Sequence, residues 1–434
     1  MYGGRGTRGS SYGRDNNTRS SYTGGAPSTP TLPPDRNIKD GLVSSSLRTL
    51  TKPSGASEEI VKPQNLRYIG SYNWQDETTP TIIVPGSPPI WRDRALPYRV
   101  PFDTGIVMVD QNNYRMGTSC GLLPLFRAVD VMSADGSTTV DWGTVDIITD
   151  RNGLRKLLRW LAFTGEDTLK EFRIDLQLGG SKTVLMHRWE KRTRENVVPP
   201  KGGCGHNFEH ESTFAAPGCE RSTGHHRIVQ YDLGGLKIVV RFEVDACIAG
   251  SVSARGIRQA GQGRGAQVAT VVAELADILA GLDLFSTTAS QPESLGASPI
   301  QVIRAGSIVP ADSIIELTSR SVRYIHEFSW DEKYPQLVLS QTPHLYLGGH
   351  DRGTFQQIRK YRLGGSELRH VESASQQIFK QLVSILRTIQ QLMKDHGRQG
   401  SLSLVCQSDG ALKVYKRTSD AGLLPESELT RFRA

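Results

Sequence analysis

The stretch Lys237-Ile-Val-Val-Arg-Phe-Glu-Val-Asp-Ala246 limits what this chain can fold into more than any other part of the sequence. Its density of Val, Ile and Phe predicts a strand, and residues two apart on a strand face the same side. Glu243 and Asp245 are therefore expected to project together. Two adjacent carboxylates in apolar surroundings need a neutralising cation, because burying the bare charges is costly. The stretch thus predicts a divalent metal ion or a basic partner, with a solvated edge strand as the alternative.

Length and charge narrow the class of protein and partner. The 434 residues suffice for one large domain or two smaller ones. The net charge of +8 favours a polyanion, and nucleic acid before a membrane. No apolar run is long enough to span a bilayer, and the first residues lack the apolar core of a secretion signal, so we expect no membrane association and no secretion. Five widely separated cysteines indicate reduced thiols, as in the nucleus or the cytoplasm.

The beginning of the chain differs in composition from the rest. Residues 1–25 interleave arginines with glycine, serine and tyrosine, and Pro-rich and Ser-rich sequence follows. Such a segment has too little apolar surface to fold alone, so residues 1–62 are predicted to be a disordered tail and residues 63–434 a single domain. Arginine pairs with phosphates and tyrosine stacks on bases, which favours an RNA-binding tail. A solubilising linker and a mitochondrial presequence are alternatives, the latter weakened by Asp15. Residues from about 250 to 300 are predicted to form an insertion.

Hydrophobic periodicity predicts a β-rich mixture of strands and helices. Strands are expected near residues 65–74, 81–84, 104–110, 145–148 and 314–318, and hairpins within 171–189 and 402–415. One helix is expected to follow Asp150 as N-cap, because leucines recur at the spacing of one helix face; a second is expected at 373–393. The segment 337–346 is expected to continue the sheet.

Four acidic residues stand apart from those on solvated faces. Glu209, Glu243, Asp245 and Glu316 each lie within or at the end of an apolar run. Carboxylate oxygens at this density suit Mg²⁺ or Mn²⁺ better than zinc. Many nucleases use an E…ExD…ExK array of this kind to hold one or two metal ions, which activate water and stabilise phosphoryl displacement.

The order and spacing of these motifs over residues 145–355 resemble the decapping exoribonuclease (DXO) family. That family has an Arg at the start of a helix ending in Lys-Leu-Leu, followed by Gly-Tyr-Lys-Phe-Glu, Glu-Val-Asp-Cys, Glu-Leu-Lys-Thr-Ser and a Gln seven residues before a Pro. The corresponding residues here are Arg151 with Lys156-Leu157-Leu158, Gly205-His-Asn-Phe208-Glu209, Glu243-Val-Asp245-Ala246, Glu316-Leu317-Thr318-Ser319-Arg320, Gln336 with Pro343, and Leu345-Tyr-Leu-Gly-Gly-His350. The chain is accordingly identified as a divergent, fungal member.

The resemblance implies an α+β fold, in which mixed β-sheets and flanking helices with a PD-(D/E)XK-like core enclose a central cleft for metal and RNA. It implies hydrolysis of incomplete or non-standard caps or of 5′ di- or triphosphates on single-stranded RNA, in RNA quality control, with 5′-3′ trimming in some members. Docking of a separate 5′-3′ exoribonuclease is left open, and so is the oligomeric state.

The same resemblance implies roles for individual residues. The metal ligands, to Mg²⁺ or Mn²⁺ or its waters, would be Glu209, Glu243, Asp245, Glu316 and the carbonyl of Leu317. Gln336 would join the four acids in catalysis. The residues that bind the substrate would be Arg151, Lys156, Arg320 and Gln336.

One departure from the family pattern bears on activity. Thr318 stands where the family has the lysine of Glu-x-Lys. A hydroxyl lacks the positive charge that positions and polarises an attacking water. No lysine or arginine on another strand is apparent as a replacement. The alternative function is therefore an RNA 5′-end-binding protein with impaired catalysis.

A zinc site is the remaining alternative for the chemistry. Several possible zinc ligands fall close together in the sequence: Cys204, His206, His210, Cys219, His225 and His226. Their spacing matches no standard pairing of close cysteines. A prenyl diphosphate synthase is excluded, because the chain has no Asp-Asp-x-x-Asp motif and its pattern is β-rich.

Overall fold

The computed structural model describes residues 32–433, except for residues 57, 118–119, 167, 200–202, 251–298, 398–399 and 420–421. The first half of the predicted tail and nearly all of the predicted insertion lie outside the described residues. The chain from Pro34 to Ala434 forms one compact unit.

A large mixed β-sheet forms the centre of this unit. In spatial order its eleven strands are β1 (Arg48–Leu50), β20 (Leu412–Lys416), β19 (Leu402–Cys406), β8 (Phe172–Gly179), β9 (Thr183–Trp189), β7 (Ile147–Asp150), β13 (Leu236–Val244), β12 (Ser222–Leu233), β2 (Gln64–Gln75), β3 (Thr81–Pro85) and β15 (Gln301–Ala305). Most neighbours are antiparallel, whereas β7 runs parallel to both β9 and β13.

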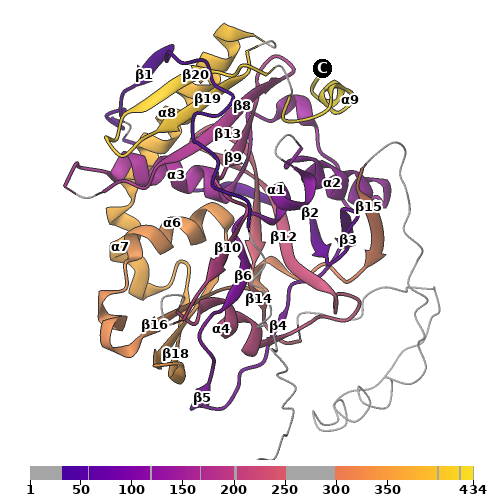
Figure 1. Cartoon of the computed structure of the whole chain (residues 1–434), viewed down its shortest axis with the longest axis vertical. Helices are drawn as coiled ribbons and strands as arrows, with labels where there is room; N and C mark the ends of the chain where they lie inside the picture. The colour runs from indigo at the N-terminus through magenta and orange to yellow at the C-terminus, as the bar shows by residue number, and fades with distance from the viewer. Residues whose placement is uncertain are drawn as a thin grey trace, which may run out of the picture. The chain divides into compact units, whose positions relative to one another are not determined.

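Strand β13 shows why the sheet is buried on both faces. Ile238 and Val240 belong to one hydrophobic core, and Val239 between them belongs to another. Alternate side chains on a strand point to opposite faces, so an unbroken apolar run fits a strand that is covered on both sides. Helices α3 (Arg151–Ala162) and α8 (Gln376–His396) pack together beside one core, and α2 (Leu123–Ala134) packs on β2 and β3 beside the other (Figure 1).

A smaller mixed sheet lies next to the large one. Its strands, in spatial order, are β11 (Thr213–Phe214), β4 (Ile90–Trp91), β14 (Ala246–Cys247), β16 (Ile314–Ser321), β17 (His344–Asp351), β18 (Thr354–Arg362) and β5 (Tyr98–Arg99). A third, short ribbon pairs β6 (Gly105–Met108) with β10 (Arg194–Val197). An aromatic core that includes Trp91, Phe208 and Phe355 fills the small sheet.

The remaining helices connect these sheets. They are α1 (Gln111–Met116), α4 (Gly205–Glu211), α6 (Trp330–Ser340), α7 (Arg369–Ala374) and α9 (Glu426–Leu429), with 3-10 turns at Trp142–Thr144, Ala311–Ser313, Val322–Glu327, Ser366–Leu368 and Thr430–Phe432. Within the described ranges, no helix combines the length and the apolar composition needed to cross a bilayer. The predicted α+β fold, with mixed sheets and flanking helices, is confirmed.

Three local expectations differ from the structure. Residues 34–62 are part of the compact unit and not of a separate tail, because β1 pairs with β20 and Val61 lies in the core. Leu337–Ser340 is the end of α6 and not a strand; the apolar run and Pro335 inside the helix hide its periodicity. The predicted edge-strand alternative for residues 237–246 fails, since β13 lies between β7 and β12.

Candidate functional site

The four predicted acids come from four different places in the fold. Glu209 lies on α4, Glu243 near the end of β13, and Glu316 on β16 of the small sheet. Asp245 is the single residue between β13 and β14, at the point where the chain passes from the large sheet to the small one. The structure brings these carboxylates close enough to perturb one another's ionisation.

Their pKa values record this crowding. Burial, and then the charges of Asp245, Glu243 and Glu316, raise the pKa of Glu209 well above its usual range. Burial and the charge of Glu316 do the same to the pKa of Asp245. Glu209 and Asp245 are half-buried and Glu243 is exposed, but carboxylates crowded together repel one another, which drives them towards the protonated form. A cation placed among them would therefore be strongly favoured.

Glu316 differs from its neighbours because two cationic side chains and one amide already contact its carboxylate. Arg151 Nη1 lies 3.0 Å from its Oε2, and Lys333 Nζ lies 3.4 Å from its Oε1. Gln336 Nε2 also donates to Oε1. Burial opposes ionisation of Glu316, but Arg151 and Lys333 outweigh it, and the pKa of Glu316 is below its usual value.

The backbone of β16 approaches the crossing residue directly. The amide of Leu317 donates to Asp245 Oδ2 at 2.8 Å, which places the Leu317 peptide beside the acids. On the other side, Gly224 of β12 leaves room for Glu243: a Cβ at Gly224 would lie 2.7 Å from Glu243 Oε1. Any larger residue at 224 would force the Glu243 carboxylate to move.

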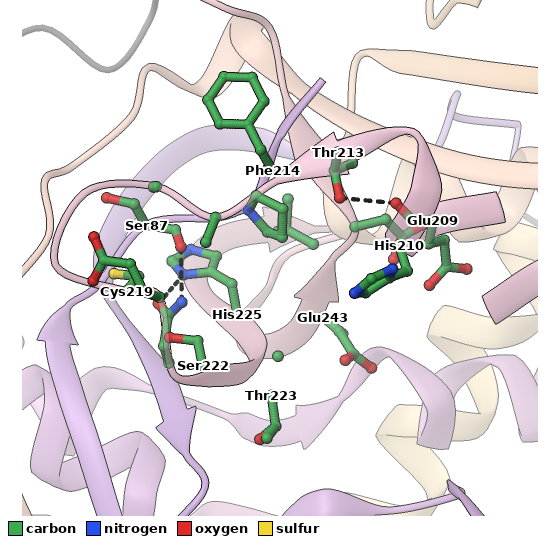
Figure 2. A pocket seen from close by; sticks show the side chains of 18 of the residues that line it. Ser87, Glu209, His210, Thr213, Phe214, Cys219, Ser222, Thr223, His225 and Glu243 are labelled. Atoms are coloured by element: carbon green, nitrogen blue, oxygen red, sulfur yellow. Dashed lines mark hydrogen bonds between the residues drawn. The ribbon is translucent and has the colours of Figure 1, made fainter. Parts of the chain in front are cut away.

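A cavity opens at this junction of the two sheets. Its volume is about 370 Å³, and Glu209, Glu243 and Asp245 are among its lining residues. Figure 2 shows Glu209 and Glu243 on its wall together with His210 and His225. The cavity therefore gives a ligand access to three of the four acids.

The donor chemistry of the cluster fits a hard divalent cation, since all four side chains offer carboxylate oxygens. The arrangement of the side chains is less complete: in the described part of the chain, no three Asp, Glu, His or Cys side chains are placed so that they could hold one metal ion. Glu316 explains part of this, because it is bonded to Arg151, Lys333 and Gln336. For Glu316 to bind a metal ion, its carboxylate would have to give up at least one of these hydrogen bonds.

Guanidinium groups from helix α3 and strand β9 face the acids. Arg151 begins α3, and Arg155 follows one turn later; burial, then repulsion by Arg151, lower the pKa of Arg155 to about 10. Arg151 and Arg188, the latter on β9, both favour the charged form of Glu243, whose side chain is exposed at the end of β13. Concentrated guanidinium groups beside a carboxylate cluster suit a phosphorylated ligand.

Two predicted substrate-binding residues lie outside this group. The buried ammonium of Lys156 donates to Glu190 Oε1 at 2.8 Å and to the carbonyl of Trp189 at 3.0 Å. Arg320 is exposed, four residues beyond Glu316 on β16. Their roles stay predictions.

Lys333, like Arg155 and Arg188, lies at the site but was not predicted from the sequence. Its ammonium comes from a helix, whereas a replacement for the missing lysine was sought on strands. It lies three residues before Gln336, so the two share a face of α6. That spacing would have indicated Lys333 had residues 330–340 been predicted as a helix.

The possible zinc ligands contact different parts of the protein. Cys204 packs in the aromatic core. His226 stacks on Tyr72 at a ring separation of 5.0 Å, and His225 Nδ1 lies 2.7 Å from Asn73 Oδ1. No three of these side chains are placed to hold one metal ion in the described part of the chain, so the structure gives the zinc alternative no support.

A family model described as "Domain of unknown function (DUF8563)" matches residues 44–432. The chain belongs to this family. The description of DUF8563 carries no activity, and no curated protein matches the sequence.

Solved structures share the fold of this DUF8563 chain. S. pombe Rai1 aligns with a TM-score of 0.51 at 12% identity, covering 85% of this chain and 99% of that chain. Scheffersomyces stipitis Rai1, in complex with (3′-NADP)+ and calcium ion, gives 0.51 at 12% identity over 90% of this chain and 95% of that chain. Candida albicans Rai1, in complex with pU5-Mn²⁺, gives 0.50 at 11% identity over 89% and 98%. At this identity the likeness establishes the fold alone.

Proposed function

We propose that this chain is a divalent-metal-dependent hydrolase of RNA 5′ ends, acting on incomplete or non-standard caps or on 5′ di- or triphosphates. The observation that carries the proposal is the convergence of Glu209, Glu243, Asp245 and Glu316 opposite Arg151. Acids that neutralise a metal and a guanidinium that neutralises phosphate are the two halves of a phosphoryl-transfer site.

The residues of this chain have separate tasks in the proposal. Glu209, Glu243, Asp245, Glu316 and the carbonyl of Leu317 would hold Mg²⁺ or Mn²⁺. The bound ion would supply an activated water and stabilise charge on the phosphoryl oxygens. Arg151 and Gln336 would release Glu316 in part and hold the reacting phosphate. Arg155 and Arg188 would add to the positive potential that attracts it.

Other features support RNA as the substrate. The net charge of +8 suits a polyanion. The fold is shared with Rai1 proteins, which belong to the decapping exoribonuclease family that the motifs resemble, and one of those Rai1 structures holds pU5 with Mn²⁺. We accordingly propose a role in RNA quality control in the nucleus or cytoplasm. A 5′-3′ exoribonuclease as partner and 5′-3′ trimming by this chain stay predictions.

The test is hydrolysis of a short single-stranded RNA with a labelled 5′ triphosphate in Mn²⁺. The wild type should release the label, and Glu243→Gln should not, although it should still bind the RNA. Glu426→Gln, an exposed acid on α9, is the matched control and should behave as the wild type. Absence of release by the wild type would overturn the proposed hydrolase.

The second candidate is an RNA 5′-end-binding protein with impaired hydrolysis. Thr318 favours it, and so does the bonding of Glu316 to protein donors. In the same experiment this candidate predicts no release, tight binding of 5′-phosphorylated RNA, and loss of that binding in Arg151→Met.

A further inference from the structure

Lys333 supplies a positive charge at the point where the family pattern lacks one. Its Nζ lies 3.4 Å from Glu316 Oε1, and its side chain is 24% exposed. Thr318, two residues after Glu316 on β16, has only a neutral hydroxyl. The Lys333 ammonium therefore contacts the Glu316 carboxylate from helix α6, whereas a lysine at position 318 would belong to strand β16.

The charge of Lys333 extends beyond Glu316. It lowers the pKa of Glu209 against the larger effects of burial and the neighbouring acids. Glu209 lies on α4 and Glu316 on β16, so Lys333 acts on two acids from separate elements. A cation that contacts Glu316 and also acts on Glu209 would act on a ligand that the two carboxylates share.

Gln336 adds a second, independent observation. Its Nε2 donates to Glu316 Oε1, the same oxygen that Lys333 approaches. Its Oε1 is buried and has no donor among the described residues. Since a buried acceptor is normally satisfied, this oxygen is suited to accept a hydrogen bond from a small donor such as water. Lys333, which has three N–H donors, could donate to the oxygen of that same water.

Helix α6 fixes the positions of Lys333 and Gln336 relative to the rest of the site. It packs against α3, which begins with Arg151, and against β13, which carries Glu243. Lys333 and Gln336 are one turn apart on it, so their head groups are set by one backbone. Lys333 is thus held in register with the arginine and the acids of the site.

We infer that Lys333 positions and polarises the attacking water, together with the amide oxygen of Gln336, in place of a lysine at position 318. This inference rests on the proposed hydrolase. In that hydrolysis the water oxygen forms a bond to phosphorus while the P–O bond to the leaving group breaks. The proton lost by the water leaves to solvent, and Lys333 stays protonated throughout.

The experiment compares Lys333→Met, Thr318→Lys, the double variant Thr318→Lys/Lys333→Met and the control Lys413→Met. Lys413 is matched to Lys333: its side chain is 30% exposed and pairs loosely with Asp409 at 3.7 Å, on the distant strand β20. The substrate is 5′-triphosphate RNA in Mn²⁺. Lys333→Met should lower kcat about one-hundred-fold, the cost of one positioned catalytic donor, with KM changed less than about three-fold. The double variant should recover at least about ten-fold of that loss.

A readout without turnover accompanies it. Removing a positive charge beside the acids should strengthen Mn²⁺ binding to the RNA-free protein, measured by calorimetry, in Lys333→Met but not in Lys413→Met. Circular dichroism checks folding, and Lys333→Gln replaces Lys333→Met if the methionine variant unfolds.

The outcomes separate the inference from the proposed function. If the wild type hydrolyses the RNA and Lys333→Met is equally active, the inference is overturned and the proposed function stands. A loss of kcat that Thr318→Lys does not restore overturns it as well, because the effect is then structural. If the wild type releases nothing, both fail, and activity in Thr318→Lys alone would show that Lys333 cannot replace the missing lysine.

Discussion

Asp150 and Arg241 form a buried, two-pronged ion pair between β7 and β13, with Nε to Oδ1 at 2.6 Å and Nη2 to Oδ2 at 3.0 Å. Asp150 occupies the N-cap position of α3, as predicted, but its side chain makes no capping hydrogen bond. The carboxylate is instead used for Arg241. Because Arg151 is the next residue, this pair fixes the point at which Arg151 begins α3.

Loss of this pair should destabilise the protein. Arg241→Met would leave Asp150 buried without its partner, and breaking a buried pair costs about 3–5 kcal/mol. Urea unfolding should show that loss, whereas Arg433→Met, which breaks the exposed pair with Glu426, should cost less than about 1 kcal/mol. Equal losses in the two variants would mean that the buried pair contributes no more to the free energy of unfolding than the exposed pair does.

Divalent metal should stabilise the wild type against heat. The raised pKa values of Glu209 and Asp245 mean that ionising these crowded carboxylates at neutral pH destabilises the folded state. A bound cation relieves that repulsion. Binding at one hundred times the dissociation constant contributes about 2.7 kcal/mol, which is a rise of several degrees in Tm. Scanning calorimetry with Mn²⁺, and then with excess chelator, measures it. Glu209→Gln should lose most of the rise and Glu426→Gln none; a rise that survives Glu209→Gln would place the metal elsewhere.

Arg151 should determine affinity for a phosphorylated 5′ end. A charge-assisted hydrogen bond contributes about 1.5–3 kcal/mol, so Arg151→Met should weaken binding about ten-fold to one-hundred-fold. Fluorescence anisotropy with 5′-phosphorylated RNA in Ca²⁺ measures the affinity. RNA with a 5′ hydroxyl should show little difference between wild type and variant. A similar loss for both RNAs would indicate that Arg151 contacts the chain of the RNA and not its end.

Acid should destabilise the protein through His226. Burial, and then the charge of Arg241, lower the pKa of His226 to about 3. A folded-state pKa below the unfolded value of about 6.5 gives stability that is complete above pH 6.5 and is lost as the pH falls towards 3. His226→Phe keeps the ring that stacks on Tyr72 but cannot be protonated. Between pH 7 and pH 5, denaturant unfolding of the wild type should lose about 2 kcal/mol more than that of the variant. Parallel losses would contradict the assignment.

Much of the sheet could be predicted from sequence, because buried strands such as β13 consist of consecutive β-branched residues. Strand β2 and the hairpin of β8 and β9 were likewise expected close to where they occur. The order of the strands could not be predicted: β7 lies between β9 and β13, and those partners depend on packing of residues far apart in the chain.

The four acids of the candidate site and Arg151 were predicted from the sequence, whereas Lys333 was not. Glu209, Glu243, Asp245 and Glu316 are conspicuous because each interrupts apolar sequence. Lys333 is one ordinary charged residue in a charged segment, and only the position of α6 brings it to Glu316. The capture of Glu316 by protein donors also depends on three elements that meet only in the folded chain.

The single-residue connection at Asp245 determines how a ligand of the acids would affect the two sheets. Glu243 belongs to the large sheet and Glu316 to the small one, with a single residue joining the strands β13 and β14 between them. A ligand bound by both acids would link the large sheet to the small sheet. Binding of such a ligand would therefore also hold the large sheet and the small sheet together.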